Sequence, residues 1–271
     1  MRLRYDSVVT LAFVKYQGLG NDFVVVETDR LMSADRAVRL CDRRRGIGAD
    51  GVLSILPARR GGTAYMHVFN SDGSVAAMCG NGVRCVARHL AEARGLRDTV
   101  DVETDAGTKR CTLHLRADGS VEAVTVEMGP ARYLGEEAFT VGGQVLRAQR
   151  VSMGNPHAVF LGEASRERAR TLGPLVERAV EGGVNAGFAA LRGGGIDLVV
   201  WERGAGLTEA CGTGACAAAV AAVQVGLLPA GDAVDVRLPG GVLQITVAPD
   251  LQGVRMRGPA ERVFDGRTDL A

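Results

Sequence analysis

The sequence predicts an α+β protein made of two similar, pseudo-symmetric domains, each a β-sheet or barrel wrapped round one central helix. Three observations predict this fold: the length, an internal repeat, and the same order of apolar segments in both halves. The chain has 271 residues, enough for two ordinary domains. Gly20-Asn21 recurs as Gly154-Asn155, and Cys79-Gly-Asn-Gly recurs as Cys211-Gly-Thr-Gly. Landmarks that repeat in one order indicate duplicated units.

Six landmarks in all recur at a nearly constant offset, which chance explains poorly. The offset is 134 residues for Asn21 and Asn155 (155 − 21) and 132 for Cys79 and Cys211 (211 − 79). We therefore expect a first domain over residues 1–122 with 262–271, and a second over 123–261. The other landmarks are the apolar runs Tyr65–Phe69 and Ile196–Trp201, helical segments ending near Gly95 and Gly226, Val100–Val102 and Val234–Val236, and Gly129–Ala131 and Gly258–Ala260.

Each half is expected to contain short strands, then one helix, then a strand–turn–strand unit. After Cys79, apolar side chains fall on one helical stripe, and Gly95 is a typical helix end. The segment Ala215–Val225 is apolar on all sides, which predicts a fully buried helix. The hairpins are expected at Leu113–Leu115 with Val121–Val126 and at Val234–Leu238 with Val242–Val247, and a surface helix at Arg166–Arg170 and Glu177–Glu181 in the second half only.

Composition excludes several classes of function. The net charge is +1 and aromatic residues make up 4% of the chain, which argues against nucleic-acid binding. No apolar run approaches eighteen residues, so no membrane span is expected. The chain begins with basic residues, Met1–Arg4, and an apolar run, Val8–Val14, as a secretory signal peptide would. Asp6 interrupts this pattern and no convincing cleavage site follows, so we expect a cytoplasmic protein rather than a secreted one. The scarce, scattered histidines predict no metal site.

Two of the six cysteines stand where a helix is expected to begin. Cys79 and Cys211 each precede Gly-x-Gly, and a thiol at a helix N-terminus is expected to have a lowered pKa. Two such thiols in opposite protonation states could invert a carbon centre, one removing a proton and the other returning one. The alternatives are packing alone or a disulfide, and packing is the interpretation for the remaining thiols, Cys41, Cys85, Cys111 and Cys216.

The lysines argue against a pyridoxal phosphate enzyme. The chain has only two, Lys15 in an expected strand and Lys109 in an expected hairpin turn. Neither position suits a Schiff base in a preformed site, so the sequence favours a reaction without a cofactor.

With these residues assembled, the chain resembles the diaminopimelate epimerases from about Phe13 to Phe264. The resemblance implies cofactor- and metal-independent conversion of LL- to meso-2,6-diaminopimelate, on the route to lysine and peptidoglycan precursors. The motifs that carry it are Gly18-Leu-Gly-Asn-Asp-Phe23, Gly46-Ile-Gly-Ala-Asp-Gly51, Phe69-Asn-Ser-Asp-Gly73, Met78-Cys-Gly-Asn-Gly-Val-Arg-Cys85, Ser152-Met-Gly-Asn-Pro-His157, Val184-Asn-Ala-Gly-Phe188, and Trp201-Glu-Arg-Gly-Ala-Gly206 followed by Ala210-Cys-Gly-Thr-Gly-Ala-Cys216.

The resemblance also assigns roles to residues. Cys79 and Cys211 are the acid–base thiols, and His157 and Glu202 are candidates for orienting or assisting them. The substrate, a diamino dicarboxylate, is expected to contact Asn21, Asn70, Gly80, Asn81, Asn155, Asn185, Glu202, Arg203, Gly212 and Thr213. Arg203 suits a carboxylate because a guanidinium binds it through two hydrogen bonds.

Three positions depart from the family pattern, namely Gly51, Leu207 and Phe264. Many members have a ligand-contacting Gln in place of Gly51 and a Glu in place of Leu207. They commonly have a dimer-interface Tyr in place of Phe264, so the resemblance implies a homodimer whose interface differs at this position. About ten residues precede the usual start. Two alternatives stay open: an epimerase or racemase of another amino acid on the same fold, and a non-catalytic amino-acid-binding or redox-sensing protein.

Overall fold

The computed structural model describes residues 10–269 as two compact units. The first unit runs to Val124 and takes up the chain again from Ala260, and the second is Thr125–Pro259. Strand β8 (Val121–Gly129) passes from one to the other. The basic start of the chain, on which the expectation about secretion depends, lies outside the described residues. Among residues 10–269, no helix combines the length and apolar character that a membrane span requires.

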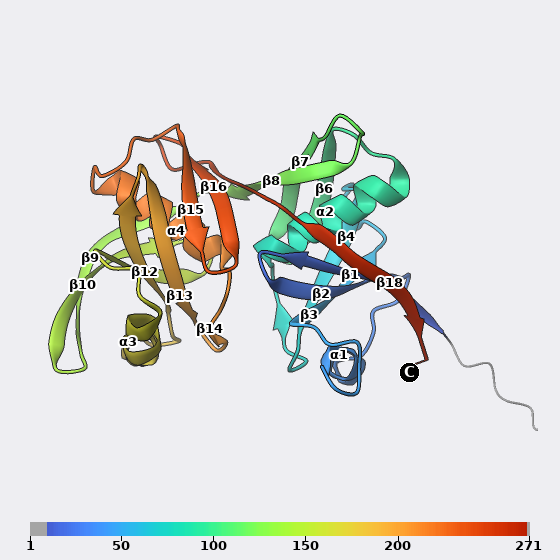
Figure 1. Ribbon diagram of the computed structural model, residues 1–271, viewed down its shortest axis with the longest axis horizontal. Coiled ribbons are helices and arrows are strands. Elements are labelled where there is room, and N and C mark those ends of the chain that lie inside the picture. The colour runs from blue at the N-terminus through green and yellow to red at the C-terminus, as the bar shows by residue number, and fades with distance from the viewer. Residues whose placement is uncertain (1–9, 270–271) are drawn as a thin grey trace, which may run out of the picture. The chain divides into compact units, whose positions relative to one another are not determined.

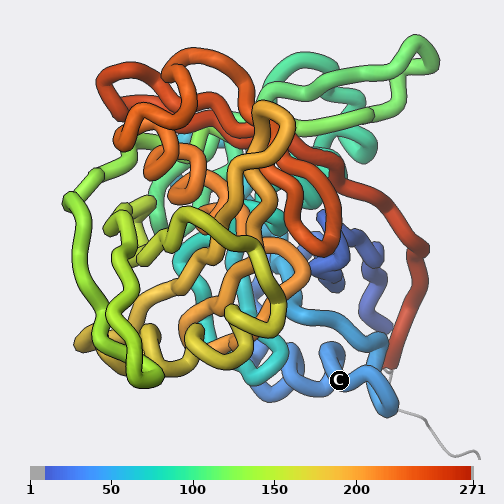
Figure 2. The backbone as a smooth tube through the Cα atoms, turned by 60° about the vertical axis from the view of Figure 1, so that its left-hand side comes forward, coloured from blue at the N-terminus to red at the C-terminus, as the bar shows by residue number. Residues whose placement is uncertain are grey.

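The first unit contains ten elements besides β8 (Figure 1). They are β1 (Leu11–Gly18), β2 (Asn21–Glu27), α1 (Ala34–Cys41), β3 (Gly51–Leu56), β4 (Ala64–Asn70), β5 (Val75–Ala76), α2 (Gly80–Arg94), β6 (Thr99–Thr104), β7 (Gly107–Leu115) and, at the end of the chain, β18 (Glu261–Thr268). Strand β18 pairs antiparallel with β1, so the two ends of the described chain lie side by side, as the red and blue segments of Figure 2 show.

The second unit is built in the same way. Its elements are β9 (Arg132–Val141), β10 (Gln144–Ser152), β11 (Pro156–Leu161), α3 (Arg166–Ala179), β12 (Asn185–Arg192), β13 (Gly195–Glu202), β14 (Gly206–Leu207), α4 (Gly212–Gln224), β15 (Ala233–Leu238), β16 (Gly241–Val247) and β17 (Val254–Gly258).

The two units repeat one strand topology. In the first, β1–β2 is antiparallel, β2–β3 parallel, β3–β4 antiparallel, β4–β6 parallel and β6–β7 antiparallel. In the second, β10–β11, β11–β12, β12–β13, β13–β15 and β15–β16 follow the same sequence of orientations. The predicted α+β fold with a duplicated pattern is confirmed.

Each unit has a central helix because the sequence gives α2 an apolar stripe and makes α4 apolar on all sides. Helix α4 contacts β10, β11, β13 and β16, and every residue of Ala215–Ala222 is buried. Small alanine side chains let the strands approach closely on all sides. Helix α2 contacts β1, β6 and β7, with Val83, Val86 and Leu90 fully buried, and it ends at Gly95, whose φ of 67° suits glycine. The predicted stripe and helix end are confirmed.

Two expectations about local structure are wrong. The first unit also has a surface helix, α1, which begins after Ser33, whose Oγ accepts a hydrogen bond from the Arg36 N–H at 3.3 Å. At eight residues it is too short to show a periodic pattern clearly. Lys109 lies within β7, opposite Val102, because the turn falls earlier, between Thr104 and Gly107.

Candidate active site

Cys79 and Cys211 are the N-caps of the two central helices. The Cys79 sulfur accepts from the Gly82 N–H at 3.5 Å, and the Cys211 sulfur accepts from the Gly214 N–H at 3.4 Å. The second glycine of each motif is needed for space, since a Cβ on Gly214 would lie 3.1 Å from the Cys211 sulfur. The backbone thus aims a helix N–H group at each sulfur, an arrangement that favours negative charge.

Burial overrides that effect at Cys211. The side chain is buried, and its desolvation raises the pKa of the thiol well above its usual value, with the Glu202 carboxylate adding to the rise. Hydrogen bonds from Gly214 and Thr213 oppose the rise without cancelling it. The prediction of a lowered pKa is therefore wrong for Cys211, which holds its proton at neutral pH.

Glu202, at the end of β13, lies beside the Cys211 thiol and shares a hydrogen bond with it. Its Oε1 accepts from the Thr208 hydroxyl at 2.6 Å. Burial raises the pKa of Glu202, and the hydrogen bonds from Thr208 and Cys211 work in the opposite direction. The pair is a thiol next to a desolvated carboxyl group, two groups suited to holding or passing a proton. Thr208 was not predicted, because it lies between the motif that ends at Gly206 and the motif that begins at Ala210.

A chain of hydrogen bonds leads from His157 to Cys211. His157 Nε2 and Asn155 Oδ1 are 3.1 Å apart, the Asn155 amide donates to Thr213 Oγ1 at 3.2 Å, and Thr213 Oγ1 is 3.7 Å from the Cys211 sulfur. Burial, helped by the charge of Arg203, lowers the pKa of His157 to about 3. The imidazole is therefore neutral, and this network assigns its proton to Nε2.

Asn185 and Arg203, two further candidate residues of the second unit, contact each other. Asn185 Oδ1 accepts from the Arg203 backbone N–H at 2.9 Å, and its amide donates to the Pro156 carbonyl at 3.0 Å. The Arg203 side chain is exposed and donates to the Gly182 carbonyl at 2.9 Å. The structure thus brings together Cys211, Gly212, Thr213, Asn155, His157, Glu202, Asn185 and Arg203 in the second unit.

Glu177 of α3 braces the loop that carries Arg203. Its two carboxylate oxygens accept from the Gly204 N–H at 2.9 Å and from the Trp201 indole N–H at 2.7 Å. The sequence indicated only a surface helix here, and nothing in its local pattern marks this contact.

The first unit groups Cys79, Gly80, Asn81 and Asn21. The Asn81 amide donates to Asn21 Oδ1 at 3.2 Å; the contact between Asn155 and Thr213 stands in the same place in the second unit, with donor and acceptor exchanged. Asn70 lies at the end of β4, where its amide donates to Ser74 Oγ at 2.9 Å in an exposed turn. This contact lies within the turn itself, so the expected contact of Asn70 with substrate stays a prediction.

Beneath Asn21 lies a network of charges. Lys15 is buried and pairs with Asp22 at 2.7 Å, while Arg43 contacts Asp22 at 2.7 Å and Asp50 at 2.8 Å. Burial alone would raise the pKa of Asp22, but hydrogen bonds from Arg43 and Lys15 outweigh it and lower this pKa to about 2. Asp50 in turn accepts from the Asn21 amide at 2.8 Å, so the network supports the candidate site.

The low pKa of Asp22 predicts a pH-dependent contribution to stability. Because the folded-state pKa lies below the usual 3.8, this contribution is present above about pH 4 and is lost as the pH falls toward 2. We expect Asp22→Asn to lower the free energy of unfolding by about 2 kcal/mol at pH 7. Urea unfolding at several pH values measures this, with the exposed Asp29→Asn as control. An equal loss at pH 7 and pH 2.5 would contradict the account.

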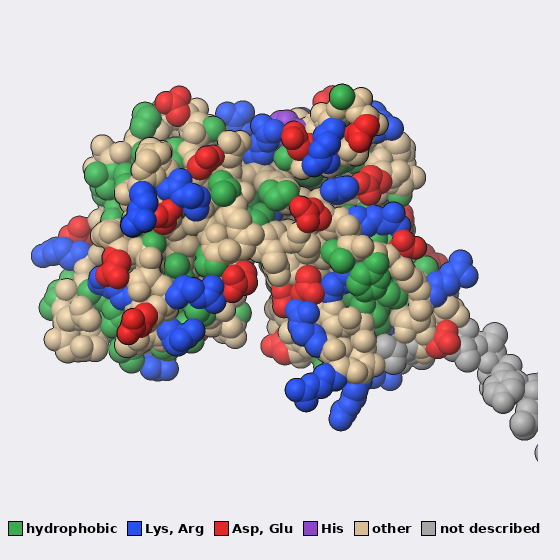
Figure 3. Space-filling model, in the orientation of Figure 1, with side chains coloured by type: hydrophobic (Ala, Val, Ile, Leu, Met, Phe, Trp, Pro, Cys, Tyr) green, Lys and Arg blue, Asp and Glu red, His purple; other side chains and the backbone are tan. Residues whose placement is uncertain are grey.

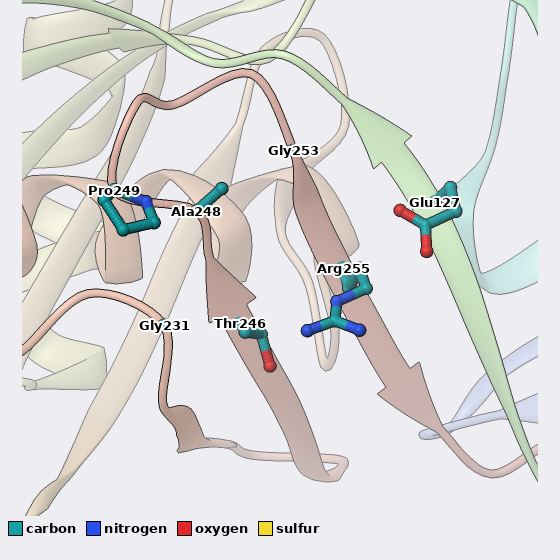
Figure 4. Close-up of a pocket in the computed structure, with 7 residues that line it drawn as sticks. All are labelled: Glu127, Gly231, Thr246, Ala248, Pro249, Gly253 and Arg255. Atoms are coloured by element: carbon teal, nitrogen blue, oxygen red, sulfur yellow. The ribbon is translucent and has the colours of Figure 1, made fainter.

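Within residues 10–269, no group of three or more His, Cys, Asp or Glu side chains is placed to hold a metal ion. On the face drawn in Figure 3, acidic and basic side chains are interspersed over each unit. A groove in the second unit contains none of the predicted site residues (Figure 4); it is lined by Glu127, Gly231, Thr246, Ala248, Pro249, Gly253 and Arg255.

Comparison with known proteins identifies the family. The family model for diaminopimelate epimerase matches residues 13–134 and 150–263. The chain belongs to the diaminopimelate epimerase family. A relative named diaminopimelate epimerase from a Cyanothece species is 44% identical, over 95% of this chain and 99% of its own length. Another of that name, from a Synechocystis species, is 42% identical over 97% of this chain and all of its own length.

Solved structures of more distant proteins share the fold. A probable proline racemase from Agrobacterium radiobacter superposes with a TM-score of 0.76 at 18% identity, over 95% of this chain and 92% of its own. A hydroxyproline epimerase from Agrobacterium vitis gives 0.73 at 18% identity, over 99% and 94%. At this identity the likeness concerns the fold alone, and the family assignment comes from the closer relatives.

Proposed function

We propose that the protein interconverts LL- and meso-2,6-diaminopimelate without a cofactor, by acid–base catalysis through Cys79 and Cys211, and so acts in the synthesis of lysine and peptidoglycan precursors. One observation carries the mechanism: the two halves cap equivalent central helices with a cysteine whose sulfur accepts a hydrogen bond from a helix N–H group. The substrate comes from the relatives, which are named for it at 42–44% identity over nearly their whole length.

The reaction moves one proton off and another onto the same carbon. A thiolate removes the α-proton, so the Cα–H bond breaks and an S–H bond forms. The opposite thiol then gives its proton to the other face of the carbanion, and no electrons leave or enter the pair of reactants. The raised pKa of Cys211 supports a resting enzyme in which Cys211 is the protonated partner and Cys79 the base. In the reverse direction the roles exchange.

Helix starts stabilise the charge that develops. As the α-proton leaves, negative charge spreads onto the substrate carboxylate, and preorganised N–H groups aimed at it lower the barrier. The backbone of Gly80-Asn81 and of Gly212-Thr213 begins α2 and α4 and supplies such groups. We propose that these segments hold the reacting carboxylate.

The distal end of the substrate requires a second polar contact set. Arg203 is an exposed guanidinium on a braced loop, and the contacts described for Asn155 and Asn185 each use one of the two amide hydrogens. We propose that these side chains bind the distal carboxylate, and that Glu202 binds the amino group or assists Cys211. His157, neutral and buried, orients Asn155.

Glu177 is expected to affect substrate binding rather than proton transfer. We expect Glu177→Gln to raise KM several-fold with kcat nearly unchanged, because an amide oxygen replaces only one of the two carboxylate acceptors and the Arg203 loop loosens. Steady-state kinetics measures both constants, and Glu181→Gln, exposed just past the same helix, is the control. A fall in kcat with KM unchanged would contradict this role.

Two further proposals concern the assembled protein. We propose a homodimer, because Val263 and Phe264 on β18 leave large apolar side chains exposed, Phe264 packing edge-on against Phe13. We also propose a cytoplasmic location, where an enzyme of this biosynthetic route would find its substrate and keep its thiols reduced. Sedimentation of the purified protein tests the first proposal.

A substrate panel tests the proposed activity. The reduced protein is incubated with LL-diaminopimelate, with meso-diaminopimelate, and with proline, hydroxyproline and lysine of one configuration each, and the products are separated on a chiral phase. We expect both diaminopimelate isomers to be converted and the other amino acids to be left unchanged. Conversion of another amino acid only would assign a different racemase or epimerase on this fold, and tight binding without conversion would assign a binding protein.

A further inference from the structure

Arg84 is a buried cation that the proposed mechanism does not use. It lies in the second turn of α2 and is fully buried, the largest such side chain among the described residues. A guanidinium inside a protein is costly unless it is paired and hydrogen-bonded. Its Nη2 donates to Asn81 Oδ1 at 3.0 Å, and a Cβ on Gly18 would lie 3.1 Å from the same nitrogen. Glycine at residue 18 thus leaves the room in which the guanidinium sits.

The contact with Arg84 begins a series of hydrogen bonds in which each donor and acceptor role is fixed. Asn81 donates to Asn21 Oδ1 at 3.2 Å, and Asn21 donates to Asp50 Oδ2 at 2.8 Å. A guanidinium can only donate and a carboxylate can only accept, so both amide groups between them are held in a single orientation. Asn21 uses its carbonyl oxygen and one amide hydrogen in these two contacts, which leaves its second amide hydrogen for another acceptor.

The second unit serves as an internal comparison because it lacks both end groups. At the repeat offsets found above, Cys216 stands in the place of Arg84 and Val184 in the place of Asp50. The strand register agrees, since Phe23 pairs with Gly51 as His157 pairs with Asn185. There the direction reverses: the loop residue Asn155 donates to the helix residue Thr213. The series of hydrogen bonds with fixed donor and acceptor roles therefore belongs to the first unit and depends on Arg84 and Asp50.

We propose that Arg84 is a positioning residue that holds the Asn81 and Asn21 amides in the orientation that binds substrate. It acts through Asn81 and does not touch the ligand. This inference rests on the proposed function, in which Asn21 and Asn81 belong to the substrate site. In that orientation Asn21 presents an N–H donor, which suits an acceptor group of the ligand.

A double-mutant cycle tests the coupling between Arg84 and Asn81. We expect Arg84→Met, which has nearly the same length without charge, to lower kcat/KM for LL-diaminopimelate about tenfold or more, mainly through KM. In the Asn81→Ala background the same substitution is expected to change kcat/KM less than about threefold. Arg88→Met is the control, since Arg88 lies one turn later and bonds to Glu92 and the Ala260 carbonyl. A full tenfold loss in the Asn81→Ala background would overturn the proposal.

A second measurement needs no turnover and separates this proposal from the proposed function. The side-chain amide signals of Asn21 and Asn81 are followed by NMR in protein labelled with ¹⁵N asparagine. We expect slow hydrogen exchange in the wild type, and exchange at least about tenfold faster in Arg84→Met and in Gly18→Ala, which displaces the guanidinium without removing it. Should Arg84→Met fail to fold, Gly18→Ala carries the test alone. Unchanged exchange in the folded variants would overturn the proposal, even if the wild type proves to act on another amino acid.

Discussion

Replacing either Cys79 or Cys211 with alanine is expected to lower the rate of epimerisation by roughly a hundred- to ten-thousand-fold while leaving the fold intact. In the proposed mechanism each thiol handles the proton on one face of the α-carbon, so neither can replace the other. Both side chains cap helices through weak sulfur contacts of 3.4–3.5 Å, and their loss costs little stability. Initial rates in both directions, measured with thermal unfolding, test this.

Two cysteines in the same helices are matched controls. Cys85 and Cys216 are fully buried, and burial raises the pKa of Cys85 to about 12, so it stays a thiol at neutral pH. We expect Cys85→Ala and Cys216→Ala to keep their rates within a few-fold of the wild type. Full activity in Cys79→Ala or Cys211→Ala would exclude the two-thiol mechanism.

The second large effect concerns Glu202. We expect Glu202→Gln to reduce kcat by about a hundredfold, because the carboxylate beside Cys211 is removed from the proposed site of proton transfer. The same change is expected to lower the pKa of Cys211, since a neighbouring negative charge disfavours the thiolate and an amide carries none. The thiolate then forms at lower pH.

Thiol alkylation followed by peptide mass spectrometry measures that shift directly. The rate of modification of Cys211 is followed against pH in Cys79→Ala and in Cys79→Ala with Glu202→Gln. We expect the second protein to react faster at a given pH. Glu209→Gln, an exposed carboxylate paired with Arg166, is the control. A slower reaction of Cys211 without Glu202 would show that the carboxylate favours the thiolate, contrary to the account.

The parts of the fold that sequence analysis predicted are those with local or repeated signals. The Gly-x-Gly after Cys79 and Cys211, the apolar segment Ala215–Val225 and the turn at Pro239-Gly240 each determine structure within a few residues. The internal repeat then indicated that these local features belong to two copies of one structural unit. Helix α1 was missed because one short amphipathic segment has too few residues to show a period.

The parts that were missed depend on contacts between distant segments. The pKa of Cys211 follows from burial by residues around α4, which the helix-start pattern does not reveal. Glu177 and Arg84 act on loops and strands far away in sequence, the first on Gly204 and the second on Asn81 beside Asn21. A buried arginine within a helix looks, in sequence, like any charged residue on a solvated face.

The central claim is that two different groups exchange protons with the two faces of one carbon. LL-diaminopimelate is incubated with the reduced enzyme in deuterated water, and substrate and product are examined by NMR at low conversion. The account predicts meso product with one deuteron at the inverted α-carbon, while the remaining LL substrate stays largely undeuterated, because the thiol that removed the proton returns the same proton to that face. Product that retains the original α-hydrogen, or no exchange and no product from folded, reduced enzyme, would contradict it.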